Sequence, residues 1–141
     1  MINKFNELSY NEISIGQQES FIIKITESMV EKFSNLSGDL NPLHMDNQFA
    51  ESSSFKKRIV HGMLLASFFS QLIGMKLPGK NALYFSQTLN FCSPCYIDDE
   101  IEVVGEVIEK SDSTQIITVS TSIFDKSKTC LIDGIAKIIV R

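Results

Sequence analysis

One apolar helix followed by four consecutive β-rich segments constrains the fold of this chain more than any other feature. The stretch GMLLASFFSQLIGM, which starts at residue 62, is apolar on nearly all of its helical faces, and such a helix is usually buried. After the loop LPGKN, helical periodicity disappears and the chain becomes rich in β-branched residues, at 82–94, 99–110, 114–125 and 130–141. The pattern therefore predicts a long antiparallel sheet with one apolar helix to cover.

The first half of the chain supplies one strand and short helices. Residues 20–25 predict the strand. Thr26 is a good N-cap for a helix over residues 27–37, and Gly38 can end that helix by adopting a positive φ. Asp46 is a second good N-cap and predicts another short helix. Because most strands are grouped apart from the helices, we expect an α+β fold in which the sheet curls around the apolar helix.

The composition fits a single domain over residues 1–141. Hydrophobic residues make up 43% of the chain and charged residues 21%, and neither value is typical of disorder. The net charge of -4 argues against a nucleic-acid partner, which usually requires a basic surface. The N-terminal MINKFNELSY lacks the apolar run of a secretory signal, and no apolar stretch approaches the about 20 residues of a membrane span. We therefore expect a cytoplasmic protein with neither a nucleic-acid nor a membrane partner.

Three cysteines could indicate redox or metal chemistry. Cys92 and Cys95 have CxxC spacing, and Cys130 is the third. A zinc site usually needs a second pair of ligands, and this CxxC lies at a strand end, not at the strand-to-helix turn of a redox motif. We therefore expect free buried thiols in a reducing compartment, and no metal.

The stretch SGDLNPLH, residues 37–44, brings several chemically capable side chains together. Asp39 and His44 belong to the residue types that most often transfer protons in catalysis. Pro42 fixes its own φ and biases Asn41 toward an extended conformation, which stiffens the loop. A stiff loop can hold Asp39 and His44 toward one water molecule, whereas Asp39 taken alone would more often be a turn residue. The pair is therefore a candidate acid–base site.

The segments FSNLSGDLNPLHMD, RIVHGMLLASFFSQLIG and LPGKNALYFSQTLNF closely resemble the MaoC-like (R)-specific enoyl-CoA hydratases. These enzymes carry the hydratase 2 motif on a hot-dog fold, and the resemblance runs from about residue 15 to the C-terminus. It implies reversible syn addition of water to a trans-2-enoyl-CoA, which gives the (3R)-hydroxyacyl-CoA. It also implies a homodimer whose two sheets join. No glycine-rich dinucleotide loop or metal-ligand cluster in the sequence indicates a cofactor.

The resemblance assigns roles to four residues. It matches the catalytic aspartate to Asp39, the catalytic histidine to His44, the motif asparagine to Asn41, and the glycine that begins the hot-dog helix to Gly62. A glycine at a helix N-terminus exposes partnerless N–H groups and lets a thioester carbonyl approach closely. The sequence does not say which of Asp39 and His44 takes the proton of water and which one protonates Cα.

Basic residues and a second histidine lie near these motifs. His61 precedes Gly62, and we expect it to be a structural histidine that bonds the loop backbone. Four basic side chains are candidates for contacts with the phosphates of CoA, although such residues are usually only solvated: Lys56, Lys57, Arg58 and Lys80.

The apolar helix also predicts an acyl pocket. On a 3.6-residue period, Ala66, Phe69, Ser70 and Ile73 can point toward the acyl tail of a substrate docked at Gly62. Ser70 and Ile73 also resemble pocket-lining positions of short-chain family members. Because Phe69 and Ile73 are bulky, we expect a short tunnel and a graded preference for short-chain substrates.

Three other functions remain open from the sequence. The chain could act as a 3-hydroxyacyl-ACP dehydratase, on thioesters of acyl-carrier protein. It could also be a thioesterase, since one fold carries many functions. A non-catalytic acyl-CoA-binding module is the third alternative, and the intact pair of Asp39 and His44 argues against it.

Overall fold

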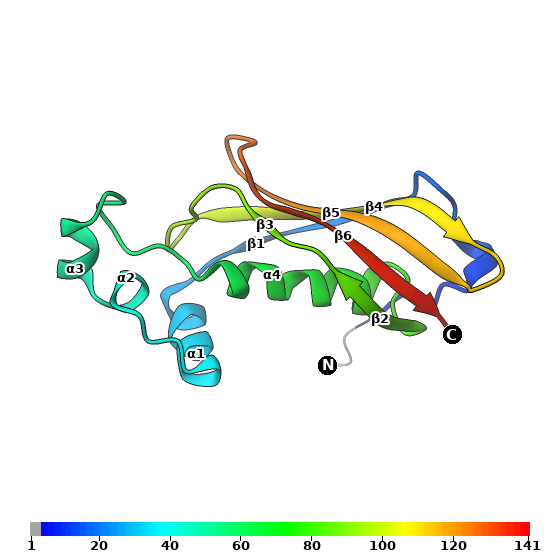
Figure 1. Cartoon of the computed structure of the whole chain (residues 1–141), viewed down its shortest axis with the longest axis horizontal. Coiled ribbons are helices and arrows are strands. Elements are labelled where there is room, and N and C mark those ends of the chain that lie inside the picture. The colour runs from blue at the N-terminus through cyan, green and yellow to red at the C-terminus, as the bar shows by residue number, and fades with distance from the viewer. Residues whose placement is uncertain (1–3) are drawn as a thin grey trace.

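The computed structural model describes residues 4–141 as one antiparallel sheet with a helix along its face (Figure 1). The six strands pair in the order β1-β4-β5-β6-β2, and β3 pairs with β6 beside β2. The strands are β1 (Gln18–Lys24), β2 (Ala82–Gln87), β3 (Asn90–Phe91), β4 (Glu100–Ser111), β5 (Ile116–Asp125) and β6 (Cys130–Val140).

The helices divide into a central helix and a group at one end of the molecule. Figure 1 shows α1, α2 and α3 beyond one end of α4, which runs from there along a face of the sheet. The helical segments are η1 (Tyr10–Glu12), α1 (Glu27–Ser37), α2 (Pro42–Met45), α3 (Asn47–Ser52), α4 (Gly62–Gln71) and the π-helical turn η2 (Leu72–Lys76).

The predicted helix ends are confirmed in the first half of the chain. The hydroxyl of Thr26 accepts a hydrogen bond from the N–H of Met29, which caps α1. Gly38 adopts a φ of 80° just after α1, the left-handed conformation that favours glycine. The carboxylate of Asp46 caps α3.

Two predicted elements have different boundaries. The apolar stretch from residue 62 is an α-helix only as far as Gln71, and then continues as the π-helical turn η2. The first predicted β segment, residues 82–94, is broken into β2 and β3 by Thr88 and Leu89. The N–H of Thr88 still bonds the carbonyl of Ile135 on β6, so the break interrupts the strand without detaching it from the sheet.

The interior consists of two apolar clusters along the central helix. The first packs Leu64, Leu65 and Phe69 of α4 against α1 and the sheet. The second surrounds Ile73 and Leu77 at the other end, and includes the ring of Tyr10 near the N-terminus. Together they fix the helix on the sheet along its whole length.

These features confirm the predicted α+β hot-dog architecture, with one difference. The helix was expected to be buried on all sides, but Met63 on α4 is 57% exposed. Apolar side chains on the neighbouring edge strands are exposed too, at Leu83, Phe85 and Phe91. Within residues 4–141, no helix is long and apolar enough to cross a membrane.

Candidate active site

The loop after α1 is shaped by hydrogen bonds between its own side chains and backbone. The N–H of Asp39 donates to the Ser37 hydroxyl, and Oδ1 of Asp39 accepts from the N–H of Asn41, at 3.2 Å. Asn41 then caps α2 by accepting from the N–H of Leu43, and Pro42 occupies the first helical position, where it needs no hydrogen bond. The short helix therefore follows Asp39 by two residues and carries His44 in its last turn.

His44 is fixed from two sides by the segment that precedes α4. Its Nδ1 lies 2.8 Å from the carbonyl oxygen of Ile59, and its own carbonyl accepts from Nε of Arg58 at 2.6 Å. Arg58 also forms an ion pair with Glu27 at 2.8 Å and is only 8% exposed. Arg58 was expected to be available for a CoA phosphate. It instead braces the loop that carries His44, because its guanidinium is already bonded on both sides.

His61 lies beneath the loop as a buried histidine. Its side chain is 2% exposed, and its Nε2 lies 3.0 Å from the carbonyl oxygen of Asp39 and 3.2 Å from the hydroxyl of Ser34. The ring stacks on that of His44, with 3.9 Å between centroids, and meets the edge of Phe33. The structure thus places His61 against the loop backbone, as the sequence predicted.

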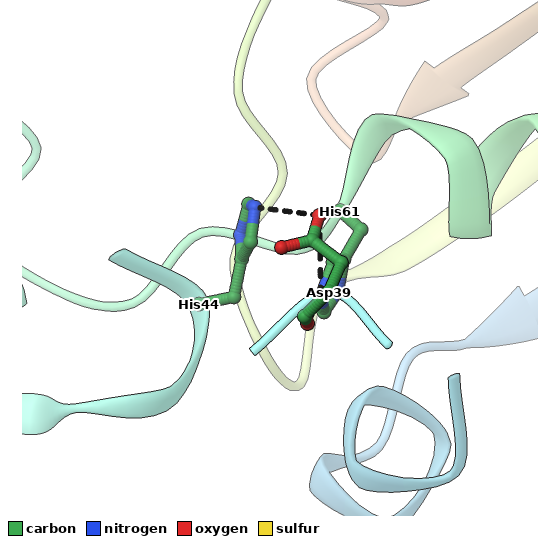
Figure 2. Close-up of side chains that lie close together, drawn as sticks. All are labelled: Asp39, His44 and His61. Carbon is green, nitrogen blue, oxygen red and sulfur yellow. Dashed lines mark hydrogen bonds and ion pairs between the residues drawn. The ribbon is translucent and has the colours of Figure 1, made fainter. Parts of the chain in front are cut away.

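Asp39, His44 and His61 converge at one point (Figure 2). Oδ2 of Asp39 lies 4.0 Å from Nε2 of His44 and 4.0 Å from Nε2 of His61. The side chain of Asp39 is 48% exposed and that of His44 is 15% exposed, so solvent reaches both. The distances exceed those of direct hydrogen bonds and leave space for a small molecule beside the carboxylate.

The neighbours of the two histidines determine which nitrogen carries the proton. A carbonyl only accepts hydrogen bonds, so Nδ1 of His44 donates to Ile59, and in the neutral ring Nε2 carries the lone pair, toward Asp39. Nε2 of His61 donates to the carbonyl of Asp39 by the same reasoning. Burial lowers the pKa of His61, which favours the neutral ring. Its Nδ1 has no hydrogen-bond partner among residues 4–141.

The three side chains are close enough to consider as a metal site. One donor atom from each lies within 4.8 Å of the other two. However, the Nε2 of His61 that faces Asp39 uses its hydrogen on a carbonyl and offers no lone pair. The arrangement therefore fits a metal poorly and suits proton transfer by Asp39 and His44.

Gly62 begins α4 directly after His61. Its N–H has no hydrogen-bond partner within the described part of the chain, as expected for the first N–H of a helix. A Cβ at this position would lie 2.5 Å from the ring of Phe91 on β3, so a larger residue would require that exposed ring to move. Gly62 and Phe91 line a groove of about 330 Å³ that continues along Ile59 and Cys92.

A second, mostly apolar groove of about 390 Å³ runs between α4 and β2. Ala66 and Ser70 line it from the helix, Tyr84 lines it from the strand, and Phe33 joins it to His61. Phe69 and Ile73 were expected in the acyl pocket too, but the structure does not bring them to this groove.

Phe69 and Ile73 are each 1% exposed and belong to the two core clusters. Ala66 and Ser70 form one i, i+4 row of the helix, whereas Phe69 is turned by about 100° from Ser70 and faces the sheet. Ile73 lies in the π-helical turn, where the α-helical period used to place it no longer applies.

The remaining basic candidates are dispersed. Lys56 and Lys57 are exposed near the site, and the ammonium of Lys57 lies 4.6 Å from the ring centroid of Tyr96. Lys80 lies beyond the opposite end of α4 and pairs with Glu7 at 3.2 Å. Of the four basic candidates, Lys56 and Lys57 are the two that remain exposed near the Asp39 loop.

Sequence reasoning missed the groups that orient the pair. The carbonyl of Ile59, the side chain of Arg58 and the hydroxyl of Ser34 all contact Asp39, His44 or His61. The sequence signal for the first two was their position, because Ile59 begins the IVHG segment and Arg58 directly precedes it. The contact of Ser34 depends on how α1 packs against α4, which the sequence does not show.

The hot-dog fold thus brings an aspartate and a histidine to face each other near the start of the central helix. Residues 11–127 match the family model described as "MaoC like domain". The chain is 38% identical over 127 residues to an (R)-specific enoyl-CoA hydratase of Aeromonas caviae, an alignment that covers 90% of this chain and 95% of the relative. The chain belongs to the MaoC-like domain family.

Two further comparisons refine this relationship. The R-hydratase of Pseudomonas aeruginosa in its unliganded form superposes with a TM-score of 0.91 at 33% identity, covering 96% of this chain and 87% of the other. A mitochondrial 3-hydroxyacyl-(acyl-carrier-protein) dehydratase of Arabidopsis thaliana is 38% identical over 114 residues, covering 79% of this chain and 68% of the relative. The relatives therefore include enzymes named for either thioester carrier.

Proposed function

We propose that this protein catalyses the reversible (R)-specific hydration of trans-2-enoyl-CoA to (3R)-3-hydroxyacyl-CoA. The observation that carries the proposal is the 4.0 Å separation of Oδ2 of Asp39 and Nε2 of His44, with acceptor lone pairs on both. The similarity to (R)-specific enoyl-CoA hydratases supplies the substrate class.

In the proposed reaction, one water molecule lies between the two side chains and donates a hydrogen to each. A separation of 4.0 Å is too long for a direct hydrogen bond but suits a water shared by two acceptors. The water oxygen forms a bond to Cβ while one proton of the water passes to one of the two side chains. The π bond breaks, and the pair returns that proton to Cα. The hydroxyl group and the proton are delivered from the same face, which gives syn addition. The reaction is redox-neutral, so we propose no cofactor.

Gly62 is the residue that we propose to stabilise the negative charge of the reaction. As the π bond breaks, negative charge develops on the thioester oxygen, and a fixed N–H at a helix N-terminus can stabilise it. The free N–H of Gly62 directly follows His61 in the chain. We therefore propose that it binds the thioester carbonyl, which places Cβ toward the water.

The two grooves offer places for the two ends of the substrate. We propose that the acyl tail enters the apolar groove beside Ala66 and Ser70, because its lining is suited to a hydrocarbon chain. The groove beside Gly62 and Phe91 then receives the thioester side. Lys56 and Lys57 remain candidates for the phosphates of CoA.

A homodimer is the proposed assembly. The edge formed by β2 and β3 exposes Leu83, Phe85 and Phe91, and an open sheet edge with apolar side chains is normally covered by a partner. We propose that a second copy covers it, and light scattering that returned a monomer mass would contradict this. We also propose a cytoplasmic location, since the three cysteines are unpaired in the structure and free thiols persist in reducing compartments.

The acyl-carrier-protein reaction is the second candidate, because one relative is a dehydratase named for that carrier. The chemistry at Asp39 and His44 would be the same in the reverse direction, so the carrier alone distinguishes the two. Parallel assays of 3-hydroxybutyryl-CoA and of the same acyl group on acyl-carrier protein decide between them.

The direct test follows crotonyl-CoA by the loss of its enoyl absorbance and analyses the product by chiral chromatography. The proposal predicts turnover to (3R)-3-hydroxybutyryl-CoA. It is contradicted by an (S) product, by release of free CoA without hydration, or by binding of crotonyl-CoA without turnover.

A further inference from the structure

A second cluster of reactive side chains lies apart from Asp39 and His44, where β3 meets the start of β6, and its Cys92 also lines the groove beside Gly62. Sγ of Cys92, Sγ of Cys130 and a carboxylate oxygen of Asp133 all lie within 4.8 Å of one another. The sequence suggested Cys92 and Cys95 as a CxxC pair, but Cys95 is 1% exposed and belongs to the core. The pairing of β3 with β6 instead brings Cys92 close to Cys130, which is 38 positions later in the chain.

The cluster is accessible and partly organised. Cys92 is exposed, contrary to the expectation that the thiols are buried, and Cys130 is half-buried. Oδ1 of Asp133 accepts a hydrogen bond from Nδ2 of Asn90 at 2.9 Å, across the β3–β6 pairing. A hydrogen bond from a neighbouring group is how metal-binding carboxylates are commonly oriented.

We propose that Cys92, Cys130 and Asp133 form a binding site for a thiophilic divalent cation such as Zn²⁺ or Cd²⁺. Two thiolates, one carboxylate and a water would complete a tetrahedral coordination shell. In such a shell, with Zn–S distances of about 2.3 Å, donor atoms lie about 3.5–3.8 Å apart. In the structure the donor atoms lie within 4.8 Å of one another, so binding requires the side chains to turn toward the cation.

The donor atoms of the cluster suit a thiophilic cation, because thiolates are ligands that Zn²⁺ and similar cations favour. Both thiols release their protons as the cation binds. The site is separate from the proposed acid–base pair and does not depend on the proposed reaction.

The test is a titration of the full-length reduced protein with Cd²⁺, kept reduced by a phosphine that does not supply thiols. The Cd–thiolate bond gives an ultraviolet absorption band, and we expect it to saturate at one cadmium per chain. Cys92→Ser and Cys130→Ser should each abolish the band, whereas the matched control Cys95→Ala should keep it.

Two further measurements refine the assignment. Competition between the protein and a chromogenic chelator for Zn²⁺ measures the affinity. Asn90→Ala removes the group that orients Asp133 and should weaken binding about tenfold to a hundredfold. Asp133→Asn removes a ligand and should weaken it more.

Several results would overturn the proposal. These are a missing thiolate band, a band that survives Cys92→Ser, or a zinc affinity unchanged by the loss of either thiol. Circular dichroism checks that each variant is folded. If Cys130→Ser fails to fold, Cys92→Ser decides the outcome, because the exposed Cys92 contributes little to the core.

Discussion

The two ends of the central helix differ in the exposure and the hydrogen bonding of the polar groups beside them. At the N-terminal end, Asp39 is 48% exposed and His44 15% exposed, and their facing atoms are not bonded to each other. At the C-terminal end, Ile73 and Leu77 are sealed in the core. There the ammonium group of Lys110 donates to the carbonyls of Tyr10 and Ile13 at 3.0 and 2.6 Å.

This contrast indicates that one end of the helix serves reactivity and the other end serves stability. Fully satisfied polar groups and tight packing stabilise a fold, whereas acceptors left facing each other are available to bind and react. We therefore expect substitutions at the N-terminal end to change rates and those at the C-terminal end to change stability.

The largest effect is expected at the acid–base pair. Asp39→Asn and His44→Ala should each lower kcat for crotonyl-CoA about a hundredfold to ten-thousandfold, the usual contribution of a general acid or base. Thermal unfolding should change little, because Asp39 is half exposed and His44 reaches solvent. Near wild-type turnover by either folded variant would contradict the expectation that residues at the N-terminal end determine the rate.

Ile73→Ala tests the opposite end. Truncating this fully buried side chain should lower the free energy of unfolding by about 2–5 kcal/mol, through lost burial and the cavity left behind. Chemical denaturation measures the loss. Because Ile73 does not reach the apolar groove, the ratio of kcat/KM between short and long enoyl-CoA substrates should stay unchanged. If the variant favours long substrates more than the wild type does, Ile73 lines the acyl pocket after all.

Much of the fold could be predicted from the sequence, because local signals and global pattern agree. Thr26, Gly38 and Asp46 act at helix ends through their own side chain or φ, which needs no tertiary contact. The acyl pocket could not be predicted in full, since an α-helical period was carried past Gln71 into a π-helical turn.

The candidate site could likewise be predicted only in part from the sequence. The SGDLNPLH segment identifies Asp39 and His44, and the structure places them 4.0 Å apart. The buried Arg58 pairs with Glu27, 31 positions earlier in the chain, so one of the basic residues expected to be solvated has a structural role. Whether a basic residue is structural or solvated therefore depends on contacts between segments that are far apart in the sequence.

Ser70→Leu tests the groove that the acyl tail is proposed to occupy. The larger side chain should fill the groove and penalise long substrates, since pocket discrimination is worth about 1–3 kcal/mol, or roughly 10–200-fold, per methylene. The measurement is kcat/KM for crotonyl-CoA and trans-2-octenoyl-CoA. Ile73→Val is the matched control, which trims the core and leaves the groove intact. Equal losses for both substrates would place the acyl tail elsewhere.

The smallest effect is expected at His61, which we infer to position Asp39. His61→Gln keeps an N–H near the carbonyl of Asp39, whereas His61→Asn is too short, so the asparagine variant should lose about two- to tenfold more in kcat with KM little changed. Equal kcat in the two folded variants would leave His61 with a packing role only.

The same residue predicts a pH effect on stability. Burial lowers the pKa of His61 in the folded state, so the unfolded chain binds more protons and stability falls as pH drops below about 6.5. This part of the acid sensitivity should be absent in His61→Gln. Denaturant titrations of the two proteins between neutral and mildly acidic pH measure it, and identical pH slopes would contradict the neutral histidine.

The central claim is that Asp39 and His44 act on one shared water, and a double-mutant cycle tests it most directly. The measurement is kcat for crotonyl-CoA hydration by wild type, Asp39→Asn, His44→Ala and the double variant, each shown to be folded. If both groups hold one water, removing the second after the first costs little, so the double variant should lose far less than the product of the two single losses. Losses that multiply fully would show that the two residues act independently and would contradict the shared water.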